Sequence, residues 1–558
     1  ADVIAKGLLA RYRARAQSLT VLVVLNKVGG AQFVQEQVEQ ALRQQASAKE
    51  CRRILDLTDF SETVVTRIVS KLSEDALLRQ LRIKHDLYHR NVAQAREVML
   101  NTDALAGVLS DEQANALGSI VSDLRDAADR ALAAGCDIDM ESDAYLRYGV
   151  ELARRNPTDS VRIREAARRI LTLKFELGVM DDPYRYCGAT KPDVRPDAYE
   201  MAVKSSVLLK NSGVLPLAAG VHVGLTGPLA AEKNGVLGNW RVSAKDQSAQ
   251  SLAEAVAGQW TYVASSPHSV GQEAFHAELT LNQTDTRAND VALKALRKHD
   301  VLVLAVGEHG NESGEGRSRT SLRISAVQQD LIRKAYATGK QVVLVVYAGR
   351  PLVLEPWIRD GAAAILWAWQ PGTMGGSALA DVLTGRREAY GRLPMTFPRS
   401  EGQIPLSYDG YSTGRPGPKP EVFWSHYTDE SNTPAYPFGF GLSYTSFEYR
   451  DLVVTPSAQG WTASVTVRNT GTRAGSDVVQ LYVGRQGNGQ LYPVKALKGF
   501  KRLTLEPGSE ARVSIELPLE ALTQRDGQGR NVLFAHGTLT VTVGPHSQDG
   551  LTWTTQMP

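Results

Sequence analysis

The sequence predicts a multidomain α/β protein with a separate β-sandwich at its C-terminus. At 558 residues the chain is too long for one ordinary domain, and about two to four are expected. Between about residues 200 and 400, short apolar runs alternate with helical segments, which is typical of a sheet covered by helices. After residue 450, alternating apolar and polar residues between turn signals predict a small β-sandwich of immunoglobulin-like character.

The composition indicates a soluble globular protein, because 43% of the residues are hydrophobic and 22% are charged. The formal charge of +3 is nearly balanced and no segment gathers Lys and Arg into a long run, so we expect no nucleic-acid partner. No apolar run approaches the length that crosses a bilayer. The chain begins at Ala1 without a methionine, so the sequence itself does not reveal a compartment. The cysteines are scattered and odd in number, which argues against a disulfide framework and a zinc site. They are Cys51, Cys136 and Cys187.

Residues 1–184 are predicted to be mostly helical. Stretches such as AQFVQEQVEQALRQQ place apolar residues at three- and four-residue steps, as amphipathic helices do. SLTVLVVLNKVGG is the one convincing buried strand of this region. Helical patterns resume from LRDAADRALAAGCDIDM and end at DDPY, where Asp181, Asp182 and Pro183 break the helix.

Residues 185–400 are predicted to form an α/β sandwich domain. VHVGLTGP, DVLVLAVGE, QVVLVVYAG and AAILWAW are expected to be strands, and AVQQDLIRKAYATG and GGSALADVLTG helices. Residues 401–449 are rich in Gly, Pro, Tyr and Ser and are expected to be linker loops. Residues 450–558 carry the strands of the β-sandwich, among them WTASVTVRNTG, SDVVQLYVG, EARVSIELP and GTLTVTVG.

The stretch AVGEHGNESGEGRSRTSLRIS, residues 305–325, places three glutamates after a buried strand. Functional groups of α/β sheets gather beyond the carboxyl ends of strands, and the four glycines would let this loop turn sharply. A glutamate here suits proton transfer, because burial can tune its carboxyl group to hold a proton near neutral pH. Arg317 and Arg319 could orient such an acid or anchor the loop, and a solvated acidic surface loop is the alternative. The three glutamates are Glu308, Glu312 and Glu315.

The same loop resembles the acid/base loop of glycoside hydrolase family three, the β-glucosidase and β-xylosidase family. Further motifs follow in the order of that family, from SSVLLKNSGVLPL (205–217) through WAWQPGTMGGSALADVLTG to YPFGFGLSYTSF. VTVRNTGTRAGSDVVQLYV and YPVKALKGFKRLTLEPG resemble its fibronectin-type-III-like terminal domain. Upstream, ALAAGCDIDMESDAY and AARRILTLKFELGVMDDPY resemble the closing part of its catalytic barrel. The resemblance covers roughly residues 130 to 558.

The resemblance implies a two-carboxylate site shared between domains. In that family a (β/α)8 barrel supplies an Asp nucleophile, the next domain supplies a Glu acid/base, and the reaction retains anomeric configuration. Such chemistry needs two carboxyl groups about 5 to 5.5 Å apart, one ionised and one protonated, and we expect no metal or cofactor. By motif position, Glu315 is implied as the acid/base, whereas Glu308 and Glu312 are implied to be structural. Asp123 in SIVSDLRDA is the candidate nucleophile, with a surface or helix-capping Asp as the alternative. Trp240 is expected to pack or to lie at the rim.

The N-terminal part is short for the barrel of that family. A complete barrel takes about 250 residues, whereas only about 184 precede the second domain here. We therefore expect an incomplete or diverged (β/α) barrel-like N-terminal part. Three explanations stay open: a degenerate barrel, a site completed by the N-terminal residues or by another chain, and a chain that is a fusion or lacks a natural segment.

The implied function is a β-glucosidase-type hydrolase that removes terminal β-linked glucosyl residues from oligosaccharides or glycosides. The alternative is a catalytically inactive relative that acts as a carbohydrate-binding or assembly protein, which the short barrel favours. A homo-oligomer is left open, since the N-terminal helices could present an oligomerisation face or form an ordinary bundle core. By resemblance we expect a periplasmic or secreted protein.

Overall fold

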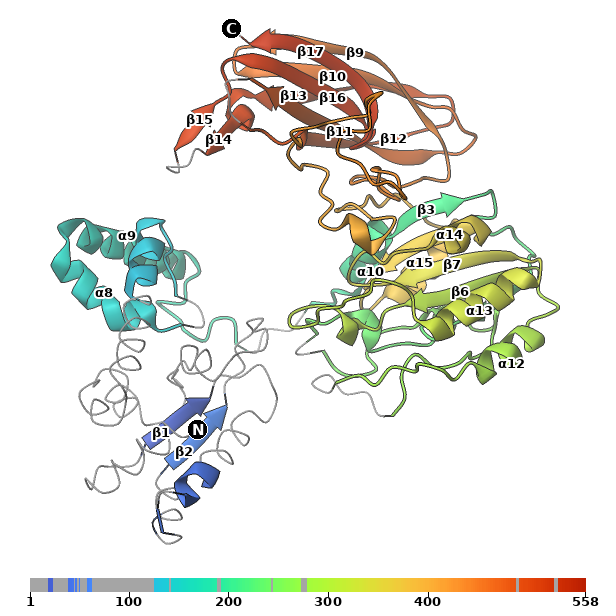
Figure 1. Ribbon diagram of the computed structural model, residues 1–558, viewed down its shortest axis with the longest axis horizontal. Helices are drawn as coiled ribbons and strands as arrows, with labels where there is room; N and C mark the ends of the chain where they lie inside the picture. The colour runs from blue at the N-terminus through green and yellow to red at the C-terminus, as the bar shows by residue number, and fades with distance from the viewer. Residues whose placement is uncertain are drawn as a thin grey trace. The chain divides into compact units, whose positions relative to one another are not determined.

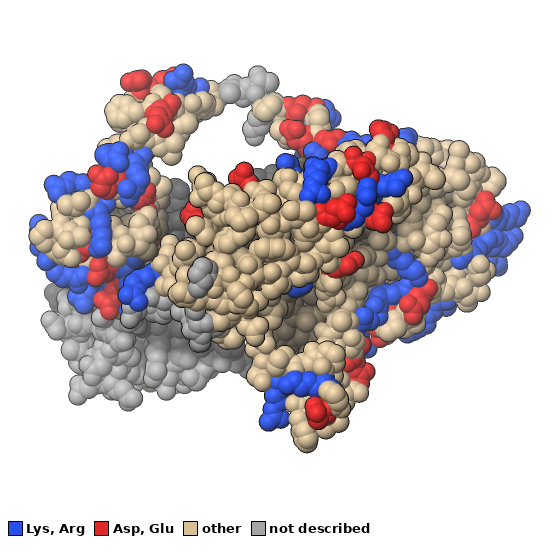
Figure 2. All heavy atoms as spheres, turned by 90° about the horizontal axis from the view of Figure 1, so that it is seen from above, with Lys and Arg blue, Asp and Glu red and all other residues tan. Residues whose placement is uncertain are grey.

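The chain divides into two compact units, residues 1–191 and residues 192–558 (Figure 1). Within the described residues, no helix is long and apolar enough to span a membrane. On the face shown in Figure 2, acidic and basic side chains of the described residues lie interspersed. The computed structural model describes residues 19–23, 39–44, 46–47, 50, 58–62, 125–139, 142–187, 192–241, 244–271, 278–487, 491–525 and 530–557.

A parallel pair of strands lies in the first unit. β1 (Leu19–Val23) pairs in parallel with β2 (Thr58–Glu62) along its whole length. The strand predicted in SLTVLVVLNKVGG is thereby confirmed, whereas β2 was not predicted. Parallel pairing requires a long crossover connection, as in (β/α) folds. A barrel built on this pair remains a prediction.

Two helices of the first unit are joined at a single residue. α8 (Ala144–Arg155) and α9 (Pro157–Glu176) are separated by Asn156, whose side chain accepts a hydrogen bond from the Thr158 N–H. Asn156 thus caps α9, and Pro157 fits its first position because proline lacks the N–H that would be unpaired there. A small core holds the hairpin against residues 125–133, which are also helical. Its members are Ala128, Leu132, Tyr148 and Leu152.

A six-stranded sheet organises the first part of the second unit, in the order β3-β8-β7-β6-β4-β5. β4 to β8 run parallel to one another, and β3 pairs antiparallel with β8 at one edge. The strand order reverses between β4 and β6, and ligands of such sheets bind beyond the carboxyl ends at that reversal. The strands are β3 (Val207–Asn211), β4 (Val223–Thr226), β5 (Thr261–Tyr262), β6 (Val301–Gly307), β7 (Gln341–Tyr347) and β8 (Ala364–Trp369).

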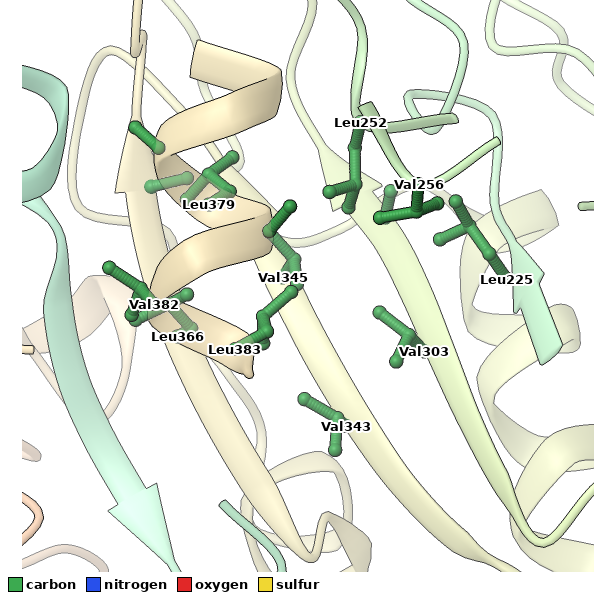
Figure 3. Packing of buried hydrophobic residues seen from close by; sticks show 14 of the residues in the cluster. Leu225, Leu252, Val256, Val303, Val343, Val345, Leu366, Leu379, Val382 and Leu383 are labelled. Atoms are coloured by element: carbon green, nitrogen blue, oxygen red, sulfur yellow. The ribbon is translucent and has the colours of Figure 1, made fainter. Parts of the chain in front are cut away.

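Both faces of this sheet are buried. Alternate residues of each central strand point into two separate cores, so these strands have continuous apolar runs. On one face Val303, Val345 and Leu366 pack toward Leu379 and Val382 of the covering helix (Figure 3). The helices on that face are α10 (Arg195–Ser205), α11 (Leu252–Ala255) and α15 (Gly375–Leu383). Those on the other face are α12 (Arg287–Ala295), α13 (Ala326–Ala337) and α14 (Pro356–Gly361).

The C-terminal part is a β-sandwich of two antiparallel sheets, in the orders β13-β10-β9 and β12-β11-β16-β17. The four strands predicted there are confirmed as β10, β11, β13 and β16. Together with the α/β sheet, this confirms the coarse fold class, a multidomain mixture of α/β and β-sandwich structure. The strands are β9 (Phe447–Ser457), β10 (Gly460–Asn469), β11 (Gly475–Gln486), β12 (Ala496–Leu505), β13 (Glu510–Pro518), β16 (Gly537–His546) and β17 (Asp549–Met557). A short pair of strands, β14 (Thr523–Arg525) and β15 (Asn531–Leu533), lies beside them.

Candidate active site

Loops that follow five strands of the α/β sheet meet at its carboxyl edge. The loop after β6 carries the three glutamates, and the loops after β4, β5, β7 and β8 contribute its neighbours. β4 and β6 are the two strands between which the strand order reverses, so the glutamate loop lies where α/β sheets bind ligands.

Glu315 occupies a tight turn in this loop. The Arg317 N–H donates to the Gly314 carbonyl oxygen at 3.2 Å, which closes a four-residue turn with Glu315 second and Gly316 third. Gly316 has a φ of 71°, as the third position of a type II turn requires. The Glu315 side chain is partly exposed. Among the described residues, its carboxyl group has no hydrogen-bond or ion-pair partner, so it remains free to meet a ligand.

Glu308 lies beneath the turn and is buried, with only 3% of its surface exposed. Its Oε1 accepts a hydrogen bond from Arg319 Nη1 at 2.6 Å and lies 3.3 Å from Arg350 Nε. Burial raises the pKa of Glu308, although the two guanidinium groups act against that rise. Its Oε2 has no hydrogen-bond partner within the described part of the chain. Glu308 therefore holds Arg319 and Arg350 by its Oε1.

Glu312 is held from three directions. Its Oε2 contacts His268 Nε2 and accepts from the His309 N–H at 2.8 Å, while its Oε1 accepts from Arg319 at 3.3 Å. Burial raises the pKa of Glu312, but the hydrogen bonds and the nearby positive charge outweigh it and keep that pKa below its usual value. Glu312 is thus an ionised structural group.

Gln328 of α13 fixes the point where β6 ends. Its side-chain amide accepts from the Gly307 N–H at 2.7 Å, donates to the Gly307 carbonyl oxygen at 2.9 Å and lies 3.1 Å from His268 Nδ1. Gly307 has a φ of 126°, which side chains rarely permit. A Cβ at Gly307 would lie 1.9 Å from the Tyr347 carbonyl oxygen of β7. The chain therefore needs glycine where the strand turns into the glutamate loop.

Gly307→Ala is expected to destabilise the α/β domain by about 2–3 kcal/mol, because the new methyl group meets the backbone of β7 and the backbone conformation is unfavourable. Gly339→Ala is the matched control, since Gly339 also has a positive φ (72°) but has open space around it. Its expected cost is about 1 kcal/mol. Urea unfolding followed by the tryptophan fluorescence of the chain measures both losses of stability, and equal losses would contradict the steric argument.

A second loop borders the Glu315 turn. A Cβ at Gly314 would lie 2.3 Å from Asn239 Oδ1, so the glycine lets the segment after β4 approach closely. Trp240, the next residue, is 71% exposed. Trp240 thus follows directly on the residue that contacts the turn, and its role in packing or at a rim remains a prediction.

Of the two catalytic residues named from the sequence, the structure describes one. Glu315 lies in the turn at the sheet edge, whereas Asp123 lies outside the described residues. Sequence reasoning missed the roles of His268, Gln328 and Arg350. Gln328 lies in the predicted helix AVQQDLIRKAYATG and Arg350 directly follows the predicted strand QVVLVVYAG, but neither pattern shows which distant residues they contact.

Comparison with known proteins identifies the fold. Residues 206–444 match the glycosyl hydrolase family 3 C-terminal domain, and residues 477–547 match a fibronectin type III-like domain. The chain thus carries a glycosyl hydrolase family 3 C-terminal domain followed by a fibronectin type III-like domain. Neither of these family matches extends into the N-terminal part of the chain.

Two curated relatives and one solved structure illustrate what the chain is similar to. A periplasmic β-glucosidase of Salmonella typhimurium is 38% identical over 72% of this chain and 56% of its own length. A β-xylosidase of Formosa agariphila is 31% identical over 80% of this chain and 65% of its own length. The structure of a β-glucosidase from Listeria innocua in complex with glucose has a TM-score of 0.66 and 31% identity, covering 78% of this chain and 60% of that chain. The chain therefore spans less than two thirds of the length of each of these relatives.

Proposed function

We propose that this chain is a family 3 glycoside hydrolase, a retaining β-glycosidase of β-glucosidase type, which removes terminal β-linked glucosyl residues from oligosaccharides or glycosides. The observation that supports it best is the Glu315 turn. A partly exposed carboxyl group, which has no partner among the described residues, is presented where α/β sheets bind ligands, on a loop held by the ion pairs of the buried Glu308.

In the proposed mechanism Glu315 acts first as an acid and then as a base. Its carboxyl proton passes to the glycosidic oxygen while the bond from that oxygen to the anomeric carbon breaks and a nucleophilic carboxylate attacks that carbon. Glu315, now ionised, takes a proton from water, and the water oxygen displaces the enzyme carboxylate with net retention. Asp123 is our proposed nucleophile.

The relatives support the choice of substrate class and location. The β-glucosidase and β-xylosidase names of the matched proteins favour an exposed β-linked glucosyl or xylosyl end, and we place glucosyl first. The Salmonella relative is named periplasmic, which favours a periplasmic or secreted location for this chain.

A chromogenic assay tests this proposal. The chain is expected to release 4-nitrophenol from its β-glucoside, more slowly from its β-xyloside, and not from its α-glucoside, with β-glucose as the first-formed anomer in proton NMR. Stabilisation of the chain by glucose in a thermal melt, with no turnover of any glycoside, would instead identify the inactive carbohydrate-binding relative.

A further inference from the structure

Arg350 joins the two sides of the Glu315 turn. It follows β7, and its Nη2 donates to the Arg317 carbonyl oxygen at 2.8 Å and also to the Glu312 carbonyl oxygen. These carbonyl groups stand on either side of the four residues Ser313 to Gly316. One guanidinium nitrogen therefore closes the base of the segment that carries Glu315.

The surroundings of Arg350 fit it to this position. Gly349 has no side chain to collide with the loop, since a Cβ there would lie 2.1 Å from Ser313 Oγ. Ser313 Oγ in turn accepts from Gln370 Nε2 at 2.9 Å, from the loop after β8. The loop after β6 is thus fastened to the ends of the next two strands of the sheet.

The charge of Arg350 is balanced from below. Its Nε lies 3.3 Å from Glu308 Oε1, and the Glu308 side chain is only 2% exposed. A cation between a buried carboxyl group and two carbonyl oxygens has favourable partners on both sides. The position needs a guanidinium group, because a lysine ammonium group lacks the planar fork that reaches both.

We propose that Arg350 is a positioning residue for Glu315, which it holds at the place where a proton is delivered. The inference rests on the proposed function of Glu315. Without the two hydrogen bonds, a turn with glycines on both sides of Glu315 would sample many conformations. A displacement of about 1 Å at a catalytic group can cost about 100-fold in rate. Arg350 does not itself touch the substrate.

Leaving-group dependence separates positioning from a general structural role. A phenyl β-glucoside needs its leaving oxygen protonated, whereas a 2,4-dinitrophenyl β-glucoside departs without that help. Arg350→Met is expected to lower kcat/KM for the phenyl glucoside about 10- to 100-fold and kcat/KM for the dinitrophenyl glucoside, which reports only the first step, less than about 3-fold. For the phenyl glucoside, the kcat/KM of Arg350→Lys is expected to lie between that of Arg350→Met and that of the wild type.

Arg399→Met is the matched control. Arg399 also braces a loop by donating to a backbone carbonyl oxygen, that of Thr433 at 2.9 Å, and has a similar exposure. Arg399→Met is expected to leave kcat/KM for both glucosides unchanged. Equal losses of kcat/KM for both glucosides in Arg350→Met would overturn the positioning role.

Hydrogen exchange tests the clamp without using activity. The amides of residues 313–318 are expected to exchange at least about 10-fold faster in Arg350→Met than in the wild type and Arg399→Met, while amides of β6 and β7 keep their protection. Unchanged exchange in the turn would overturn the proposal that Arg350 orders residues 313–318. A wild-type chain that hydrolyses no glycoside would defeat the proposed function alone, because the exchange result would still decide whether Arg350 orders the turn.

Discussion

Glu315→Ala is expected to lower kcat/KM for a phenyl β-glucoside about 10²- to 10⁴-fold, the contribution of a positioned general acid. The loss should shrink on a 2,4-dinitrophenyl β-glucoside, whose leaving group needs no proton. In that substrate the second step becomes slow, because no base activates water.

Azide gives this prediction a product that can be identified. The azide anion needs no general base, so it should restore turnover of the dinitrophenyl glucoside by Glu315→Ala and yield the β-glucosyl azide. Glu421→Ala is the matched control, since Glu421 is an exposed carboxylate on the linker loop. Full activity of Glu315→Ala on the phenyl glucoside would remove Glu315 from the reaction, and transfer of the defect to Glu308→Gln would reassign the acid.

Asp477→Asn is expected to lower the free energy of unfolding by about 3–5 kcal/mol, the cost of leaving one member of a buried ion pair alone. Asp477 of β11 is 4% exposed and accepts from Arg392 Nη2 at 2.5 Å, which joins the β-sandwich to the segment after α15. The Tyr449 hydroxyl group donates to the other carboxylate oxygen at 2.8 Å. Burial and the charge of Asp477 raise the pKa of Tyr449, so its hydroxyl group stays protonated as a donor.

Glu510→Gln is the matched control for Asp477→Asn. Glu510 pairs with Arg450, but about half of each side chain is exposed, so the loss should stay below about 1 kcal/mol. Differential scanning calorimetry of both variants measures the difference, and a similar small shift in both would mean that the Arg392–Asp477 pair does not join the two domains.

The strands that sequence reasoning missed in the β-sandwich are edge strands. β9, β12 and β17 lie at the ends of their sheets and are exposed along much of their length, so their apolar alternation is weak. Three of the four predicted strands, β10, β11 and β16, lie inside the sheets and bury many of their residues. The fourth, β13, is also an edge strand, but its residues alternate regularly between exposed and buried, so its pattern stayed readable. β3 was missed as a strand for a related reason, since it is short and lies at the edge of its sheet.

The loop that carries the candidate site was predictable from the sequence, but the residues that contact this loop were not. The position of Glu315 followed from its place after a buried strand and from the family motif. The partners of that loop could not be found from spacing, because His268, Gln328 and Arg350 come from separate segments of the chain. Only the parallel order of the strands brings these segments to one edge.

The sequence by itself determined the layers of the second unit, because buried strands and covering helices leave apolar periods that are readable one residue at a time. It also determined that a carboxylate-rich, glycine-rich loop follows β6. The tertiary structure alone decided that β4 lies beside β6, that Arg350 bridges the turn and that Glu308 balances the positive charge of Arg350. Those facts depend on hydrogen bonds and charges between residues distant in the chain, and no local pattern records such contacts.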